Sequence, residues 1–376
     1  MEGPWRKLSC LNERIKKGSM KNILVTGGAG FIGSNFIHYL LRVEKNITVF
    51  NLDALTYAGN LDNLSDVGND PRYNFVQGNI CDAEFIERLL HDHQIDTVVH
   101  FAAETHVDRS ILGPRQFIET NVMGTFTLLE AARKFWLQEK GLPLEDVRFH
   151  HVSTDEVFGS LAPGEPAWTE ETPYAPNSPY AASKASSDHL VRSYGHTYGL
   201  PYTITNCSNN YGPYQFPEKL IPVIILNAIE GKPLPVYGDG QQIRDWLHVE
   251  DHCDAIHLVL TKGKNGSTYN IGGENQPANL TIVETICEIL DEITPKSPHK
   301  PHKNLIQFVK DRPGHDRRYD MDTHKISTEL SWRPRHTLTE GLLDTVHWYL
   351  SHPEWLAEIR QKHEYQGWMN ANYKSR

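Results

Sequence analysis

The stretch "ILVTGGAGFIGSNF" at residues 23–36 decides the fold. A short apolar run typical of a buried strand leads into a helix-like pattern, and the glycines between them are Gly27, Gly28, Gly30 and Gly33. Glycines at such a turn let the backbone approach a pyrophosphate, and the following helix offers free N–H groups and a positive dipole end. Asp53 follows about 20 residues later, where a carboxylate accepts hydrogen bonds from ribose hydroxyls and repels a 2′-phosphate. The pattern predicts a dinucleotide site that favours NAD over NADP.

Strand and helix patterns alternate from Met20 to about residue 206, and the strand-like runs are apolar and β-branched. This alternation is typical of an α/β fold with a Rossmann-type doubly wound parallel sheet. Beyond residue 206, Pro and Gly break the rhythm, which indicates a smaller, loop-rich C-terminal substrate-binding domain. We therefore expect an NAD-binding domain over 20–205 with a returning segment near 243–265, and mainly the substrate domain over 206–376. Residues 1–19 are expected to be a disordered leader from a tag or an upstream start.

The composition excludes several classes of protein. The chain has 376 residues and a net charge of −10, and a nucleic-acid binder needs a basic face instead. There is no apolar run of about 18 residues, so no membrane helix is expected. The five cysteines form no C-x-x-C pair, which predicts neither a disulfide framework nor a metal site and fits a reducing cytoplasm. Among the twenty histidines, the near pairs in "HDH" at 91–93 and "KSPHKPHK" at 296–303 are interpreted as a solvated surface rather than a metal site.

A second motif, "SPYAASKASSDHLV" at 178–191, places Tyr180 and Lys184 one helical turn apart on the same face. A free tyrosine has a pKa of about 10, and a nearby ammonium group favours its phenolate form. The tyrosine is then expected to take a proton from a substrate hydroxyl while hydride leaves the same carbon. Together with "TGGAGFIGS" and "NVMGT" (121–125), this motif resembles the extended short-chain dehydrogenase/reductase family.

The segment "STDEVF" at 153–158 places Thr154, Asp155 and Glu156 at the end of a predicted strand. Ligands of doubly wound sheets bind at that edge, so the adjacent acids are interpreted as an acid and a base rather than as caps of the next turn. Two carboxylates take opposite roles when their surroundings separate their pKa values. Once a sugar C4 hydroxyl is oxidised, the C5 proton becomes acidic, and the C6 hydroxyl can leave as water. Hydride then returns to C6.

Longer motifs extend the resemblance to the sugar-nucleotide dehydratases of that family, from Met20 to at least about residue 345. They include "FAAETHVDRS", "SNNYGPYQFPEKLIP", "YGDGQQIRDWLHVEDH" and "DRPGHDRRYD". The resemblance implies that Tyr180 oxidises C4 with the support of Lys184, that Thr154 orients the C4 oxygen, that Glu156 takes the C5 proton and that Asp155 is the acid for the C6 hydroxyl. The implied substrate is dTDP-glucose and the implied product dTDP-4-keto-6-deoxyglucose, for deoxysugar synthesis of the rhamnose type.

The resemblance also implies binding residues and a homodimer. The NAD site is expected to comprise Gly27, Gly30, Phe31, Ile32, Gly33, Asp53, Thr56, Asn79, Ile80, Ala102, Ala103, Tyr180, Lys184 and Asn210. The nucleotide sugar is expected to contact His106, Thr154, Asn209, Lys219, Leu220, Pro235, Tyr237, Arg244, Asn279, Arg312, His315 and Tyr319, and Glu104 is expected to border the sugar. Segments 114–138 and 178–199 are expected to pair across the dimer. Asn79 departs from the family, which has an aspartate there against the adenine.

Three other functions remain open at this point. A nucleotide-sugar 4-epimerase shares the glycine turn and the Tyr–Lys pair but has no use for an adjacent acid and base. A dehydratase that acts on a UDP-sugar differs only in the nucleobase, and one methyl group discriminates by only about 1–3 kcal/mol. A noncatalytic NAD-binding regulator would keep the fold without the chemistry.

Overall fold

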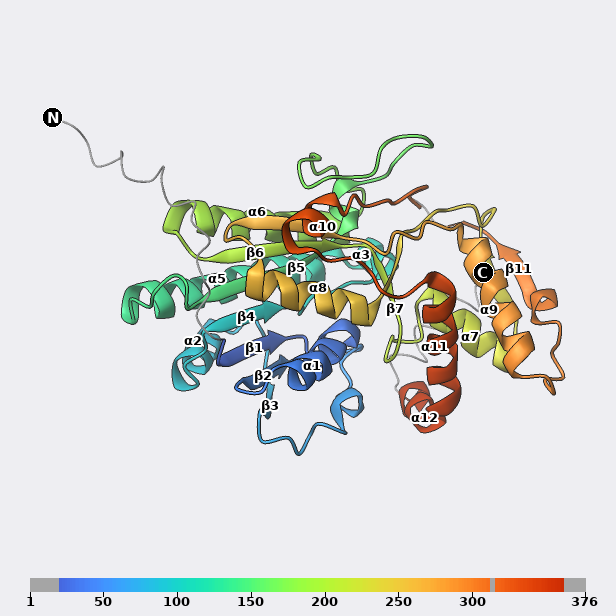
Figure 1. The fold of residues 1–376 in the computed structure, drawn as a ribbon, viewed down its shortest axis with the longest axis horizontal. Helices are drawn as coiled ribbons and strands as arrows, with labels where there is room; N and C mark the ends of the chain where they lie inside the picture. The colour runs from blue at the N-terminus through green and yellow to red at the C-terminus, as the bar shows by residue number, and fades with distance from the viewer. Residues whose placement is uncertain (1–19, 312–314, 362–376) are drawn as a thin grey trace.

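The centre of the computed structural model, which describes residues 20–311 and 315–361, is a sheet of seven parallel strands (Figure 1). Its order is β10-β6-β5-β4-β1-β2-β3. The strands are β1 (Asn22–Thr26), β2 (Thr48–Asp53), β3 (Tyr73–Gln77), β4 (Thr97–His100), β5 (Arg148–Thr154), β6 (Tyr202–Cys207) and β10 (Ser267–Ile271). The order reverses between β1 and β4, and a doubly wound sheet binds its ligand at such a switch point. The predicted fold class is confirmed.

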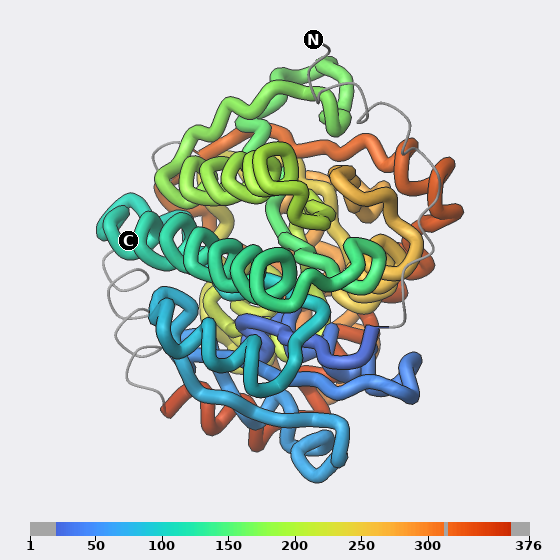
Figure 2. The backbone as a smooth tube through the Cα atoms, turned by 90° about the vertical axis from the view of Figure 1, so that its left-hand side faces the viewer, coloured from blue at the N-terminus to red at the C-terminus, as the bar shows by residue number. Residues whose placement is uncertain are grey.

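Helices cover both faces of the sheet. On one face α1 (Phe31–Val43) packs against α8 (Val249–Lys262). On the other, α2 (Ala83–Asp92) and α6 (Pro179–Tyr198) pack on either side of α5 (Gly124–Ala132), and Figure 2 shows α5 and α6 side by side. Apolar side chains fill each interface, with Phe36 on the first face and Trp136 on the second fully buried.

The helix that carries the Tyr–Lys motif has strong signals at both ends. Ser178 caps α6 by accepting a hydrogen bond from the Ala181 N–H at 3.1 Å, and Pro179 occupies the first helical position. Gly199 ends the helix in the left-handed conformation, with φ +73°. These local signals hold Tyr180 at a defined height in the first turn, next to the end of β5.

The segment before β5 is a broken helical run with π-helical turns. It consists of α3 (Val107–Leu112), α4 (Pro114–Phe117), η3 (Ile118–Met123), α5 and η4 (Arg133–Glu139). In the π-helical turn η3, the side chain of Asn121 bonds the backbone of Glu104 in both directions and donates to the Ser183 hydroxyl at 2.8 Å. Such π-turns often occur at functional sites. Here the turn joins the loop after β4 to α6.

The C-terminal part builds a separate apolar core beyond one end of the sheet (Figure 1). Its strands form two small parallel pairs, β7 (Asn209–Tyr211) with β9 (Trp246–His248) and β8 (Leu234–Tyr237) with β11 (Ile306–Val309). Its remaining elements are α7 (Leu220–Ile229), α9 (Asn279–Ile293), η6 (His302–Leu305), α11 (Leu338–Ser351) and α12 (Pro353–Gln361). The helix α10 (His324–Leu330) packs instead on β10 and α8 of the NAD-binding part, and two short helices, η2 (Leu61–Leu64) and η5 (Asp155–Phe158), lie earlier in the chain.

Two boundaries differ from the expected ones. β6 runs to Cys207, past residue 205, and β10 at Ser267–Ile271 joins the main sheet although it lies beyond the returning segment expected near 243–265. The expected leader at 1–19 lies outside the described residues. Among the residues described, no helix combines the length and apolarity that a membrane crossing requires.

Candidate active site

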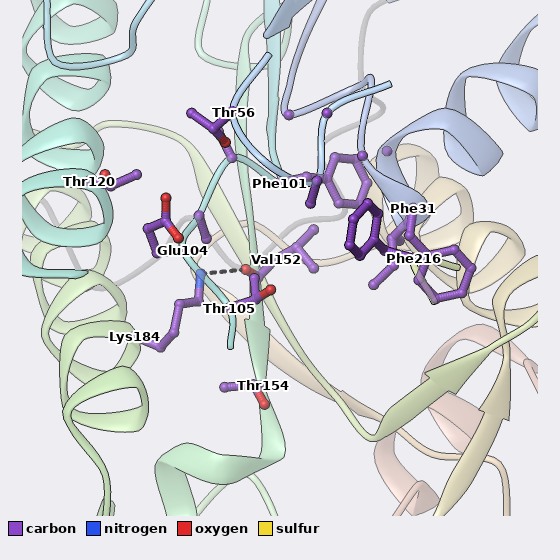
Figure 3. Close-up of a pocket in the computed structure, with 18 of the residues that line it drawn as sticks. Phe31, Thr56, Phe101, Glu104, Thr105, Thr120, Val152, Thr154, Lys184 and Phe216 are labelled. Carbon is purple, nitrogen blue, oxygen red and sulfur yellow. Dashed lines mark hydrogen bonds between the residues drawn. The ribbon is translucent and has the colours of Figure 1, made fainter. Parts of the chain in front are cut away.

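A cavity of about 370 Å³ opens at the carboxyl ends of the strands, which is a volume typical of small-ligand sites. Every cofactor-binding residue predicted from the sequence lines this cavity, from the glycine turn to Asn210. The five predicted catalytic residues line it as well: Thr154, Asp155, Glu156, Tyr180 and Lys184. Figure 3 shows Phe31, Phe101 and Phe216 on one side of the cavity and Lys184 on the other. The structure thus brings both predicted sets into one crevice.

The glycine turn leaves no room for side chains. Gly27 has φ +72°, and a Cβ atom there would lie 2.7 Å from the Ala102 nitrogen. A Cβ atom on Gly33 would lie 2.3 Å from the Gly27 oxygen. Asp53 accepts from the N–H groups of Ala29 at 2.9 Å and Leu55 at 2.8 Å, which holds the carboxylate at the end of β2. A close-packed turn, a helix N-terminus and a fixed carboxylate fit a dinucleotide such as NAD.

Asn79, the departure from the family pattern, also lines the cavity. Its side-chain oxygen accepts from the Cys81 N–H at 2.9 Å. This contact orients the side chain, so its NH₂ group is the donor that remains for a base. The amide oxygen has a second lone pair, so the side chain still offers the donor and the acceptor that we expected.

The two adjacent acids are placed by the end of β5 and the short helix η5. Thr154 accepts from the Glu156 N–H at 3.3 Å and donates to Asp155 Oδ1 at 3.1 Å. Asp155 is only 1% exposed. Burial, and after it the neighbouring Glu156 charge, raise the pKa of Asp155 well above its ordinary value. The raised pKa favours the protonated form of Asp155, which is the state that an acid needs.

The pKa of Tyr180 is shifted in the direction opposite to the expected one. We expected the Lys184 cation to favour the phenolate, but burial and then the Glu156 charge raise the pKa of Tyr180 well above its ordinary value, against the effect of a hydrogen bond with Thr154. Lys184 donates to the Val152 carbonyl at 2.8 Å (Figure 3), and burial lowers the pKa of its ammonium group to about 8. Burial therefore favours the protonated form of Tyr180 in the protein alone.

The predicted substrate residues fall into two groups. Thr154, Asn209 and Lys219 line the cavity. His106 is buried instead, with Nε2 3.9 Å from Glu218. The others do not line the cavity and belong to the C-terminal part: Leu220 begins α7, Pro235 and Tyr237 lie on β8, Asn279 begins α9, and Arg244, His315 and Tyr319 lie on loops.

The second group has its own contacts. The Arg244 guanidinium lies 4.1 Å from the centre of the Tyr319 ring, and the Tyr237 and His315 ring centres are 6.3 Å apart. Burial, and after it the Glu156 charge, raise the pKa of Tyr319 well above its ordinary value. The Arg244 charge acts on Asp155, where it opposes the rise in pKa. Arg244 and Tyr319 therefore lie near the catalytic acids. The predicted contact Arg312 lies outside the described residues.

Several residues of the cavity wall were not predicted from the sequence. The Arg109 guanidinium lies 3.8 Å from the centre of the Tyr57 ring, and its Nη2 is 3.5 Å from Glu218. Tyr57, Gln116 and Glu218 line the cavity, as does Glu104, which was expected to border the sugar. Arg109 and Glu218 lie inside the motifs "FAAETHVDRS" and "SNNYGPYQFPEKLIP", but neither motif shows that the two side chains meet at Tyr57.

In the part of the chain that the structure describes, one group of side chains could hold a metal ion. Ligand atoms of His248, Glu250 and His336 lie within 4.8 Å of one another. His248 Nδ1 caps α8 by accepting from the Glu250 N–H, Glu250 pairs with Arg42 at 2.5 Å, and His336 pairs with Asp251 at 3.0 Å. These contacts give the grouping a structural role at the helix N-terminus.

The parallel sheet, the glycine turn and the Tyr–Lys pair on α6 define an extended short-chain dehydrogenase/reductase. The family model for GDP-mannose 4,6 dehydratase matches residues 24–345. A dTDP-glucose 4,6-dehydratase from Salmonella typhimurium is 56% identical over 362 residues, which cover 94% of this chain and 99% of that protein. The chain belongs to the nucleotide-sugar 4,6-dehydratase family, among the dTDP-glucose 4,6-dehydratases.

Solved structures agree with this placement. The dTDP-glucose 4,6-dehydratase of Streptomyces venezuelae, solved with NAD bound, has a TM-score of 0.81 and 47% identity over 90% of this chain and 99% of its own. A UDP-glucose 4-epimerase from Thermotoga maritima has a TM-score of 0.76 but 29% identity, over 88% of this chain and 99% of its own. The epimerase shares the architecture at much lower sequence similarity.

Proposed function

We propose that this protein is an NAD-dependent hydro-lyase that converts dTDP-glucose to dTDP-4-keto-6-deoxyglucose. The observation that carries the proposal is the pair Asp155 and Glu156 in one cavity with Tyr180 and the glycine turn, the first acid buried with a raised pKa. An oxidation alone needs no such pair, and neither does an epimerisation. The dTDP-glucose dehydratases among the relatives support the choice of substrate.

Each side chain has one role in the reaction. Tyr180 takes the proton of the C4 hydroxyl, and the Lys184 ammonium favours the phenolate that this step needs. Bound NAD takes the C4 hydride and later returns it to C6, and its positive ring when oxidised lowers the pKa of Tyr180 from the raised value of the protein alone. Thr154, which bonds both Tyr180 and Asp155, orients the C4 oxygen.

The elimination then uses the two acids in opposite senses. Glu156 removes the C5 proton, which is acidic beside the C4 ketone, while Asp155 gives its proton to the departing C6 hydroxyl, which leaves as water. After hydride returns to C6, Glu156 gives a proton back to C5. Tyr180 is left with one extra proton and Asp155 without one, and exchange with solvent resets both. The net reaction is loss of one water with no net change in the cofactor.

Residues from both groups of predicted contacts hold the nucleotide part of the substrate. Lys219 at the cavity and Arg244 behind it supply positive charge to an otherwise acidic protein, and a guanidinium fork suits phosphate oxygens. Tyr237 and Tyr319 offer ring surfaces. The product, a 4-keto-6-deoxy sugar nucleotide, is a precursor of deoxysugars of the rhamnose type.

A homodimer is part of the proposal. The segment from α3 to α5, which overlaps the segment expected to pair, exposes large apolar side chains, with Leu112 78% exposed. They are Ile111, Leu112, Ile118, Met123 and Phe126. Such a concentration favours association. Cys81, Cys207, Cys253 and Cys287 are free thiols, which favours a reducing cytoplasm.

The experiment that tests the proposal compares the wild type with Glu156→Gln on dTDP-glucose. The wild type is expected to release a product lighter by one water. Glu156→Gln is expected to oxidise C4 and stop, which leaves reduced nicotinamide on the protein without release of a dehydrated sugar. Full turnover by Glu156→Gln, or a C4 epimer of unchanged mass from the wild type, would contradict the proposal.

A further inference from the structure

A buried polar chain lies beneath the catalytic lysine. Lys184 Nζ is 3.4 Å from His151 Nε2. His151 Nε2 is in turn 3.2 Å from Asp188 Oδ1. His151 and Asp188 are fully buried and Lys184 is 4% exposed. Asp188 follows Lys184 by one helical turn, so both point to the same side of α6, towards β5. Neither His151 nor Asp188 lines the cavity, so neither has a part in the proposed reaction.

Asp188 is built as a buried anion. Its Oδ2 accepts from the Tyr174 hydroxyl at 2.8 Å and from Asn206 Nδ2 at 3.4 Å. Burial raises the pKa of Asp188, but the His151 contact and the Lys184 charge outweigh it, and the pKa stays below its ordinary value. Burial lowers the pKa of His151 to about 4, so the imidazole between Lys184 and Asp188 is neutral. The chain therefore contains one cation and one anion, with a neutral ring between them.

We propose that Asp188 is a positioning residue whose buried negative charge, acting across the neutral His151 ring, holds Lys184 in its charged form for the reaction at Tyr180. This inference rests on the proposed function of the Tyr–Lys pair. A lysine that is almost fully buried loses its proton readily, and an anion nearby is what opposes that loss. The balance is close, because burial lowers the pKa of Lys184 to about 8 and Asp188 provides the largest opposing effect. The lysine is thus held charged at neutral pH with little margin.

Other polar groups face this chain from the elements packed against it. Tyr174 and Asn206 bond Asp188, Arg192 bonds Tyr174 at 2.8 Å, and the His100 ring centre lies 5.2 Å from that of His151. Burial lowers the pKa of His100 well below its ordinary value, so this ring is neutral. Burial raises the pKa of Cys207 to about 12, so its thiol is neutral too. Asp188 is therefore the anion of this cluster that acts on Lys184.

The first test is the pH profile of kcat for holoenzyme with Asp188→Asn, compared with the wild type. The step at Tyr180 needs charged Lys184, so activity falls as pH rises through the pKa of that lysine. Asp188→Asn is expected to move this basic limb to lower pH by about one unit, with little change in KM. The matched control is Ser187→Ala, since Ser187 is equally buried on α6 and bonds only the carbonyls of Asn121 and Ser183. Its basic limb should match that of the wild type.

A uniform fall of activity at every pH, with the basic limb in place, would show that Asp188 only supports the fold and would overturn the proposal. Absence of dehydration by the wild type would instead overturn the proposed function.

A second measurement is independent of activity. In a double-mutant cycle of Asp188→Asn and Lys184→Met, thermal unfolding of the double variant should show a smaller loss of Tm than the sum of the single losses. Additive losses would overturn the proposal, even where Asp188→Asn alone folds poorly.

Discussion

Replacement of Asp155 by asparagine should separate the chemistry of this residue from its structural role. Asp155 is buried and holds a proton in the folded protein. An amide has nearly the same shape as the protonated acid, and its oxygen can still accept from the Thr154 hydroxyl as Asp155 does at 3.1 Å. The variant should therefore fold with its cavity intact, but it has no acidic proton for the C6 hydroxyl.

The stability of Asp155→Asn should exceed that of the wild type, by an amount that depends on pH. The folded state binds a proton at Asp155 that the unfolded chain gives up above pH of about 4. The contribution of this proton to the stability of the wild type is fully present below that pH. Above it, the contribution falls by about 1.4 kcal/mol per pH unit until the raised pKa of the folded state is reached. An asparagine has no such dependence, so the gap between the two proteins should widen from pH 5 to pH 7.

Two assays check these expectations. Chemical denaturation at pH 5, 6 and 7 measures the gap in free energy of unfolding, and steady-state kinetics measure the rate of water loss. The rate should fall by about 10²–10⁴, the usual contribution of a positioned acid. A constant stability gap across this pH range, or a variant that dehydrates its substrate at the wild-type rate, would refute the assignment of Asp155 as a protonated acid.

Three further changes test the cofactor site and the surface. Gly33→Ala should destabilise the fold by about 1–3 kcal/mol and weaken NAD binding, because its Cβ atom would lie 2.3 Å from the Gly27 oxygen; wild-type melting and affinity would contradict this. Asn79→Asp keeps the acceptor for the Cys81 N–H and offers a second acceptor in place of the NH₂ group, so NAD affinity measured by calorimetry should rise by about 1 kcal/mol; an unchanged or lower affinity would count against it. Leu112→Glu should shift the protein towards monomers in sedimentation without loss of NAD, whereas an unchanged dimer would place the interface elsewhere.

The fold was largely predictable because its signals are local. The strand, glycine turn and helix at 23–36 are continuous in sequence, and Ser178 and Gly199 mark both ends of α6. The boundary of the NAD-binding part was less predictable, because β10 joins the main sheet only by pairing with β6, more than sixty residues earlier. A strand of five residues in a loop-rich region carries little local signal of its partner.

The candidate site divides in the same way. Motifs on single elements led to the acids and to the Tyr–Lys pair. The cluster of Tyr57, Arg109 and Glu218 joins distant segments, and a motif on one segment does not show which residues of another segment it meets. The pKa of Tyr180 was also missed. Its direction depends on how deeply the hydroxyl is buried, and spacing along a helix does not report burial.

The central claim, that oxidation, elimination and reduction occur in one cavity, is tested most directly by isotope transfer. The wild type would be given dTDP-glucose with deuterium at C4, and in a parallel reaction unlabelled substrate in heavy water. The account predicts a product lighter by one water, with the C4 deuterium at C6 in the first reaction and solvent deuterium at C5 in the second. A C4 epimer of unchanged mass, or loss of the C4 deuterium to solvent, would contradict it.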